Sequence, residues 1–296
     1  MDENLKRNVS HNIVLPKRRI HKLILAFPAS TTVIEQTLRE KTLAVGRIGR
    51  YISIFRIDEV IVYVDDKKYE EEANIIIDIL KYMEVPPYLK KKIIPLKKTL
   101  KYAGLLPPLQ APHHQTNIDV QVGEIREAIV VKDGKRVLID VGSRNYFELE
   151  QQGESKLRKG MRLTVKILSL TPPKAKIIDR NSIDAYWGFK VIKVHSLKNA
   201  ITYSKADLII ATSRYGRYIN EVMDDLKKDM MKSQRILILF GGPYKGLYEI
   251  ARDEGWYLEE KVHYVINTVP YQGVKTVRTE EAIGITLSII NILLPI

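Results

Sequence analysis

The chain of 296 residues contains no cysteine and little tryptophan or phenylalanine. The absence of cysteine excludes disulfides, zinc–thiolate sites and thiol catalysis, and it is compatible with a cytoplasmic protein. The N-terminus has no basic segment followed by an apolar run, so we predict no signal peptide. The longest apolar run, IGITLSIINILLPI at 283–296, is too short for a confident membrane span and predicts a buried helix.

Acidic residues are scarce relative to basic ones. The chain has 48 Lys and Arg against 35 Asp and Glu, a net charge of +13. An excess of this size favours a polyanionic partner, most often nucleic acid. The alternative explanation is the lysine-rich surface of a thermophilic protein.

The length and the hydrophobic pattern predict two domains. Residues 1–19 are polar and basic, and we expect a flexible basic arm there. The segments 20–94 and 186–296 alternate strand-like and helix-like runs. This alternation is typical of an α/β domain with a parallel sheet, to which both segments contribute.

Short apolar runs predict the strands of this domain, and amphipathic runs predict its helices. The predicted strands are 20–27, 59–64, 205–213, 235–242 and 261–267, and the predicted helices are 69–84, 221–230, 245–255 and a C-terminal helix from 279. A further helix follows the first strand, and Thr31 or Thr32 is expected to cap it.

The middle of the chain has a different character. Residues 85–114 are rich in proline and lysine, which is typical of a domain crossing. Short β-like runs follow from about 118 to 180, and Asp133-Gly134 between two of them is a hairpin signal. We therefore predict an inserted β-barrel over 95–185, with an OB-like barrel as the leading interpretation.

Three loops in the C-terminal half follow predicted strands, at 211–216, 240–246 and 267–279. Ligands of open parallel sheets bind beyond the carboxyl ends of the strands. Gly241 and Gly242 allow a close backbone approach, so the loops' N–H and C=O groups can read an adenine edge. The alternative is that all three are ordinary turns.

Other ligand motifs fail on spacing or context. GGPYKGL at 241–247 does not have the spacing of a phosphate-binding loop, and Gly46 to Gly49 lies within a helical pattern. A nucleotide-dependent enzyme of another α/β class is therefore disfavoured. His113 and His114 invite a metal site, but no cysteine or acidic cluster accompanies them, so we predict no metal.

Four segments resemble the SPOUT superfamily of knotted RNA methyltransferases. They are KYAGLLPPLQAPHH (101–114), ATSRYG (211–216), LFGGPYKGL (239–247) and INTVPYQGVKTVRTEEA (266–282). The last is the most specific, and the likeness extends over nearly the whole chain. The chain most resembles the archaeal and eukaryotic RNA methyltransferases with an OB-like insertion in the SPOUT domain.

The resemblance implies a C-terminal trefoil knot, S-adenosyl-L-methionine (SAM) as methyl donor, and a homodimer that completes the site. Residues 47–63 are similar to the first SPOUT motif, which places the motif arginine at Arg50. The second motif often reads Gly-x-Glu-x-x-Gly, whereas 241–246 contains no glutamate, so no glutamate role is transferred. Tyr271 stands where many relatives have a small residue, and we expect it to alter the loop or partly cover the cofactor.

The resemblance also implies which residues bind the cofactor. All belong to the three loops or the start of the last helix: Thr212, Ser213, Arg214, Phe240, Gly241, Gly242, Pro243, Gly246, Asn267, Thr268, Val269, Pro270, Gly273, Thr276, Val277, Thr279 and Ala282.

Three residues are expected to take part in catalysis. Arg50 would steady a developing negative charge or hold a phosphate next to the target; otherwise it is a surface cation. Arg278 would clamp RNA phosphate or the cofactor carboxylate. Glu281, like Glu280, can handle a proton, but acids in a first helical turn also favour the helix dipole, and Thr279 can serve as N-cap.

The residues from 93 to 185 contain sixteen Lys and Arg against ten Asp and Glu, which predicts an RNA-tracking groove on the barrel. The alternative is a solvated basic face. The candidates are Arg47, upstream of this segment, and within it Lys97, Lys98, Lys101, Arg126, Arg136, Arg144, Arg158 and Lys159, with Tyr102 and Tyr146 as stacking surfaces.

The resemblance thus implies a SAM-dependent RNA methyltransferase acting on ribosomal RNA. Methylation of a base nitrogen, such as uridine N3, competes with methylation of a ribose 2′-OH, and the altered second motif favours the base. The alternative is an RNA-binding or ribosome-assembly factor that keeps the fold and has lost turnover.

Overall fold

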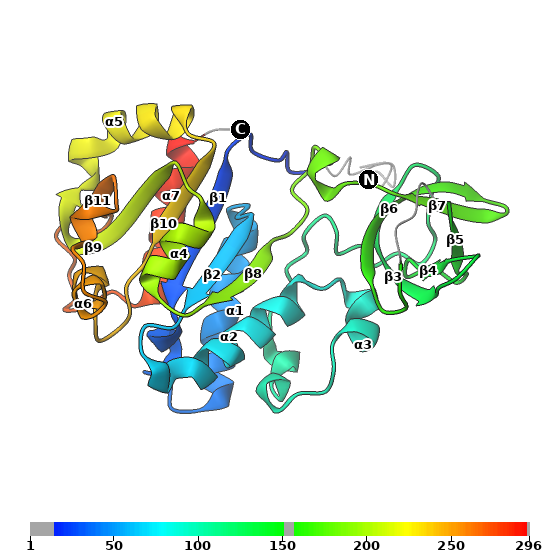
Figure 1. Cartoon of the computed structure of the whole chain (residues 1–296), viewed down its shortest axis with the longest axis horizontal. Helices are drawn as coiled ribbons and strands as arrows, with labels where there is room; N and C mark the ends of the chain where they lie inside the picture. Colours follow the sequence, from blue (N-terminus) through cyan, green and yellow to red (C-terminus); the bar gives the residue numbers. More distant parts are fainter. Residues whose placement is uncertain (1–14, 151–156, 295–296) are drawn as a thin grey trace, which may run out of the picture.

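The computed structural model describes residues 15–150 and 157–294 and contains two bodies, a helix-flanked sheet and a smaller β-barrel (Figure 1). The sheet strands are β1 (Lys22–Pro28), β2 (Glu59–Tyr63), β8 (Lys190–Val194), β9 (Leu208–Tyr218), β10 (Arg235–Leu239) and β11 (Tyr264–Asn267). Their order is β11-β9-β10-β1-β2-β8, and every neighbouring pair is parallel. The prediction of a mixed α/β fold with a parallel sheet and a separate barrel is confirmed.

Helices cover both faces of the sheet. They are α1 (Leu38–Ile54), α2 (Glu70–Glu84), α4 (Leu197–Ser204), α5 (Ile219–Lys232), α6 (Leu247–Asp253) and α7 (Thr279–Leu293). Sequence patterns missed β8 and α4, because β8 reads Lys-Val-Ile-Lys-Val without a continuous apolar run and α4 has only eight residues.

The central strands bury both of their faces. Leu23, Leu25 and Phe27 of β1 join the core formed with α1, α2, α5 and α7. Ile24 and Ala26 join the core on the opposite face, with α4 and α6. Alternate side chains of a strand point to opposite faces, so a continuous apolar run is required here.

Thr37 caps α1, so the prediction of Thr31 or Thr32 as the cap was wrong. The Thr37 hydroxyl accepts a hydrogen bond from the Glu40 backbone N–H at 3.2 Å, and the Glu40 carboxylate accepts one from the Thr37 N–H at 2.9 Å. This reciprocal pair satisfies two backbone donors. Thr31 and Thr32 lie in a short 3₁₀ turn that precedes the helix.

The barrel is closed by five strands, β3 (Ile125–Lys132), β4 (Leu138–Asp140), β5 (Phe147–Glu150), β6 (Arg162–Leu170) and β7 (Pro173–Ile177). It therefore begins later than the predicted boundary at residue 95. Leu100, Leu106 and Leu109 instead pack against the core of the sheet domain. The proline-rich pattern of this stretch concealed the contribution of these leucines, of which Leu109 is buried.

The predicted arm over 1–19 falls mostly outside the described residues. The described part, 15–19, is attached to the molecule. Lys17 forms a β-bridge with Ala185, and the buried Arg19 donates to the Phe55 carbonyl at 2.6 Å. These bonds correct the prediction of a flexible arm at its C-terminal end.

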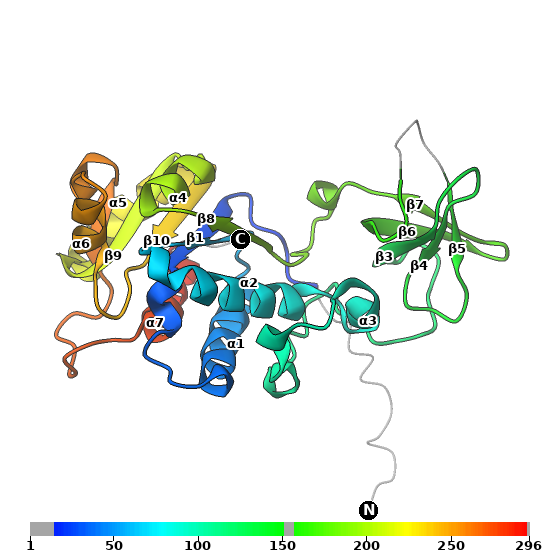
Figure 2. The same cartoon turned by 60° about the horizontal axis from the view of Figure 1, so that its bottom comes forward.

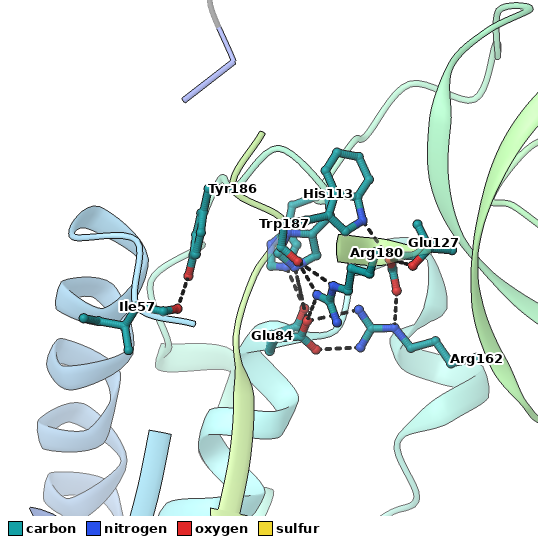
Figure 3. Close-up of polar contacts among 10 residues, drawn as sticks. Ile57, Glu84, His113, Glu127, Arg162, Arg180, Tyr186 and Trp187 are labelled. Atoms are coloured by element: carbon teal, nitrogen blue, oxygen red, sulfur yellow. Dashed lines mark hydrogen bonds and ion pairs between the residues drawn. The ribbon is translucent and has the colours of Figure 1, made fainter. Parts of the chain in front are cut away.

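A buried charge cluster connects the two bodies (Figure 3). Arg162 of β6 donates from Nη1 to Glu84 of α2 and from Nε to Glu127 of β3, both at 2.5 Å. Arg180 donates to Glu84 at 2.8 Å, and the Trp187 indole N–H donates to Glu127 at 2.8 Å. The cluster fixes the barrel against the end of α2, because each ion loses its partner if the two bodies separate.

The paired histidines belong to the same junction. The Nε2 atoms of His113 and His114 each lie 2.9 Å from the Glu84 carbonyl oxygen, at the C-terminal end of α2. Helix ends leave such carbonyls without helical partners, so the two rings satisfy one of them. Burial lowers the pKa of both rings, that of His113 well below its ordinary value, so both are neutral donors.

We predict that Glu84→Gln lowers the free energy of unfolding by about 3 kcal/mol, because it leaves Arg162 buried without one carboxylate. The measurement is urea denaturation. Glu148→Gln is the control, because Glu148 pairs with an exposed Arg136 and its loss should leave the free energy of unfolding almost unchanged. Equal losses in both variants would contradict a buried clamp.

We also predict that stability falls as the pH drops below about 6.5, the ordinary histidine pKa. Since the folded pKa values are depressed, the unfolded chain binds more protons in this range. Urea midpoints compared at about pH 7.5 and about pH 5.5 measure the effect. The loss should shrink in His113→Gln/His114→Gln and remain in the control His195→Gln; an unchanged loss in the double variant would refute the assignment.

Candidate functional site

A cavity of about 210 Å³ lies at the carboxyl ends of β9, β10 and β11. The three predicted loops and the start of α7 form its walls. The lining residues are Thr212, Ser213, Arg214, Tyr215, Phe240, Gly241, Gly242, Pro243, Tyr244, Gly246, Glu249, Asn267, Thr268, Val269, Gln272, Thr276, Val277, Thr279 and Ala282.

The first wall is a bulge within β9 and not, as predicted, a loop after a strand. Pairing with β11 passes from Ala211–Val265 directly to Arg217–Ile266, so residues 212–216 leave the ladder. A Cβ atom at Gly216 would lie 2.7 Å from the Ile266 carbonyl carbon. Only glycine therefore allows the bulge to close against β11.

The second wall is the loop after β10. A Cβ atom at Gly241 would lie 2.9 Å from the Gly246 Cα atom, so the two ends of the loop touch through main chain. The Tyr63 hydroxyl donates to the Phe240 carbonyl at 2.6 Å and anchors the loop to β2. Burial raises the Tyr63 pKa, which keeps this donor protonated.

The third wall, the segment after β11, is bonded to both other walls. The Asn267 side-chain amide donates to the Arg214 carbonyl at 3.0 Å, and the Arg214 guanidinium donates to the Lys275 carbonyl at 3.2 Å. The Thr279 hydroxyl donates to the Gly241 carbonyl at 3.1 Å. Residues 38 to 61 positions apart in sequence are thus bonded into one cradle.

Fifteen of the seventeen predicted cofactor residues line this cavity, and Pro270 and Gly273 do not. Tyr271 is also outside it, with 86% of its surface exposed and its ring 5.1 Å from that of Tyr218. The expectation that Tyr271 covers part of the cavity is therefore corrected. Its backbone does take the left-handed conformation, with φ of 54°.

Sequence reasoning missed four lining residues, Tyr215, Tyr244, Glu249 and Gln272. Three of them lie inside the loops that the sequence singled out, so the sequence indicated the correct loops but not these residues within them. Glu249 lies on α6, three residues after Gly246, where an acid in a first helical turn reads only as favourable to the helix dipole.

Arg278, Glu280, Arg47 and Glu35 form a charged rim next to the Thr279 wall. Arg278 Nη1 lies 3.1 Å from the carboxylate of Glu35. The buried Glu280 carboxylate lies 3.3 Å from Arg47 and 3.9 Å from Arg278. Both guanidinium groups are about half exposed, so they face solvent while acids behind them hold their position.

Glu281 has a structural task at the start of α7. Its carboxylate accepts a hydrogen bond from the Arg278 backbone N–H at 2.9 Å. The helix therefore starts after Arg278, and Thr279 is its first residue and not its cap. This bond satisfies one of the donors that a helix N-terminus leaves unpaired.

Arg50 does not line the cavity. Its Nη1 donates to the carbonyls of Pro108 and Leu109, at 2.8 and 2.9 Å, and so holds the 101–114 segment on α1. Within one copy of the chain, Arg50 serves packing, and its predicted catalytic role depends on the predicted homodimer.

The predicted RNA-binding residues are not one group in space. Arg126 is wholly buried, bonded to Glu124, Asn117 and the Val141 carbonyl, which corrects its assignment to a surface groove. Arg136, Arg144, Arg158 and Lys159 are exposed on the barrel segment, whereas Lys97, Lys98 and Lys101 lie on the stretch beside α1 and α2, and Arg47 lies on the rim.

Over 15–150 and 157–294, no group of three or more His, Cys, Asp or Glu side chains could hold a metal ion. Over the same residues, no helix is both long and apolar enough to cross a membrane.

The comparisons with known proteins point to one family. The model of the family described as "Putative RNA methyltransferase" matches residues 22–290. An uncharacterized protein of Halobacterium salinarum is 30% identical over 88% of this chain and 95% of its own length. The human protein named 28S rRNA (uridine-N(3))-methyltransferase is 30% identical over 91% of this chain and 78% of its own length.

A solved structure titled as the SpoU methyltransferase AviRb from Streptomyces viridochromogenes in complex with AdoMet is 10% identical, with a TM-score of 0.36. The match covers 94% of this chain and 62% of that chain.

We predict that Gly241→Ala lowers the affinity for SAM at least tenfold, about 1.4 kcal/mol, since the new Cβ meets backbone that cannot move freely. Isothermal calorimetry measures it. Gly273→Ala is the matched control, because a Cβ there meets nothing within 4 Å. If the two variants bind SAM equally well, the cavity does not hold the cofactor through the 240–246 loop.

Proposed function

Since this chain belongs to the RNA methyltransferase family whose model spans residues 22–290, we propose that it transfers a methyl group from SAM to ribosomal RNA. The observation that carries the proposal is the cradle of three loops, which lies where the family resemblance places the cofactor. The chain's excess of positive charge suits an RNA substrate.

The acceptor we propose is uridine N3. Relatives from human, mouse and fruit fly, each 30% identical over about nine-tenths of this chain, carry the name 28S rRNA (uridine-N(3))-methyltransferase. The second SPOUT motif of this chain also lacks the glutamate that is frequent in that motif.

The lining of the cavity fits SAM. The close backbone contacts at Gly216 and Gly241 leave main-chain groups on the walls, which suits the edge of a purine. Glu249 adds a carboxylate that can accept hydrogen bonds from ribose hydroxyls. When bound, SAM supplies an electrophilic methyl group on a positively charged sulfur.

The protein's contribution to such a transfer is position. The carbon–sulfur bond breaks as the carbon–nitrogen bond forms, and the N3 proton leaves to a base, so alignment supplies much of the acceleration. Arg278 and Arg47 at the rim can hold the phosphates on either side of the target nucleotide. Glu280 keeps both guanidinium groups in place from below.

We further infer a trefoil knot and an OB-like barrel. The knot is supported by the segment 267–279, which is bonded both to the 211–216 bulge and to the 240–246 loop. The OB-like assignment is supported by the closed order β3-β4-β5-β7-β6, in which β5 and β7 are the parallel pair. The domain division and the homodimer, in which Arg50 would serve the partner's site, stay predictions, as does the cytoplasmic location.

The proposal is tested by digesting RNA treated with protein and SAM to nucleosides and analysing them by mass spectrometry. Uridine N3 methylation supports the proposal, whereas a 2′-O-methyl product would show that the acceptor is the ribose 2′-oxygen and not uridine N3. SAM binding without any methylated nucleoside, across all cellular RNA fractions, would favour the RNA-binding or assembly factor.

We predict that Arg278→Ala slows methyl transfer at least tenfold and leaves SAM affinity within about twofold, because this guanidinium serves RNA. Transfer of labelled methyl to RNA and calorimetry with SAM measure the two effects. Arg252→Ala, which removes an exposed cation from α6, should change neither. A parallel loss of SAM binding in Arg278→Ala would instead assign Arg278 to the cofactor carboxylate.

A further inference from the structure

A second concave surface lies beside α1 and α2, close to the junction with the barrel. It is an open groove of about 940 Å³ formed by α3 (Lys90–Ile93), the following stretch to Ala103, and parts of α1 and α2. Both overall views place α3 and the chain that follows it beside α1 and α2 (Figures 1 and 2). We call it the lysine groove; its lysines are Lys90, Lys91, Lys97, Lys98 and Lys101.

The lysine groove carries positive charge that is compensated at one lysine only. No carboxylate lines it, and within 15–150 and 157–294 only Lys97 of its five lysines has a salt bridge, to Asp78. Elsewhere in the sheet domain, Lys41 and Lys193 are paired with Glu72 and Glu70. Like charges held together repel each other, so this cluster is complementary to a polyanion.

The groove also has apolar lining residues. Leu96 is fully exposed, and its chain neighbours Ile94 and Pro95 line the groove with it. The Lys90 ammonium lies 4.1 Å from the centroid of the Tyr82 ring, an aromatic surface beside the lysines. Cations next to apolar and aromatic surface suit single-stranded nucleic acid, whose phosphates pair with the cations while its unpaired bases pack below.

One end of the groove lies close to the rim of the cavity. Leu38, at the first residue of α1, lines the groove. Glu35, which positions Arg278 on the rim, lies three residues earlier in the chain, a span of at most roughly 10 Å. A strand with one nucleotide in the cavity can therefore continue across the rim into the lysine groove.

From this arrangement we infer that the lysine groove binds the single-stranded RNA that flanks the target nucleotide. The inference rests on the proposed function for its substrate and adds where that substrate lies. It transfers Lys97, Lys98 and Lys101 from the predicted barrel surface to the sheet domain, and it adds Lys90 and Lys91, which sequence reasoning did not select.

The test uses the full-length protein and a fluorescein-labelled 15-nucleotide oligouridylate, with binding measured by anisotropy over a series of salt concentrations. The variant Lys91→Gln/Lys98→Gln/Lys101→Gln removes three lysines that make no salt bridge to any residue the structure describes, so the fold should persist. Its slope of log affinity against log salt should be shallower by about 2, since each lost phosphate contact on single strands contributes about 0.7.

The matched control is Lys198→Gln/Lys227→Gln/Lys232→Gln, which removes the same charge from α4 and α5. It should keep a slope close to that of the parent. Leu96→Ser should weaken binding without changing the slope, because it alters a base contact and no phosphate contact. Equal slopes in the groove and control variants would overturn the inference. It would also be overturned if the groove variant lost affinity for poly-glutamate but kept the RNA affinity of the parent.

Methyl transfer separates this inference from the proposed function. The groove variant should raise the KM for RNA and leave kcat and SAM affinity unchanged. A parent protein that transfers methyl groups while the groove variant keeps its RNA affinity and KM refutes the groove alone. A parent that transfers no methyl group refutes the proposed function, and the salt slopes then decide the groove independently.

Discussion

The close approach of main chain at Gly216 and Gly241 is the constraint on which the site depends. At Gly216 a single added carbon would lie within 3 Å of the β11 backbone, and at Gly241 within 3 Å of the opposite end of the same loop. Because no side chain intervenes at either position, peptide groups can face a ligand directly. The hydrogen bonds from Asn267, Arg214 and Thr279 then tie the walls together. The cavity is therefore made mostly by backbone, and side chains supply its rim.

The junction between the two bodies, by contrast, depends on charged side chains. Glu84 and Glu127 are carboxylates placed where water is largely excluded, and Arg162 and Arg180 compensate them. Such a cluster contributes little net stability compared with an apolar core, but it is strongly destabilised when one member is lost. It sets one orientation of the barrel, and thereby sets how the barrel's exposed cations stand relative to the cavity.

Positive charge is distributed unevenly between these parts. Arg126 lies inside the barrel, the lysine groove lies outside it, and the rim arginines are held by buried or half-buried acids. The whole chain has a net charge of +13, but these three groups differ in their capacity to meet a phosphate. The buried Arg126 has none, the rim arginines keep a half-exposed guanidinium, and four of the five lysines of the lysine groove form no salt bridge within the described residues.

The sequence by itself determined the strands, the loops of the cavity and the excess of charge. Apolar runs, glycines and prolines act over a few residues, so their pattern is local. Tertiary structure alone decided that 212–216 is a bulge and that Arg50 holds Pro108 and Leu109. It also decided that Glu84 pairs with Arg162, although the two residues are 78 positions apart in the chain. Burial and ion pairing depend on which distant segments meet, so local patterns cannot tell a buried arginine from one that is free to bind RNA.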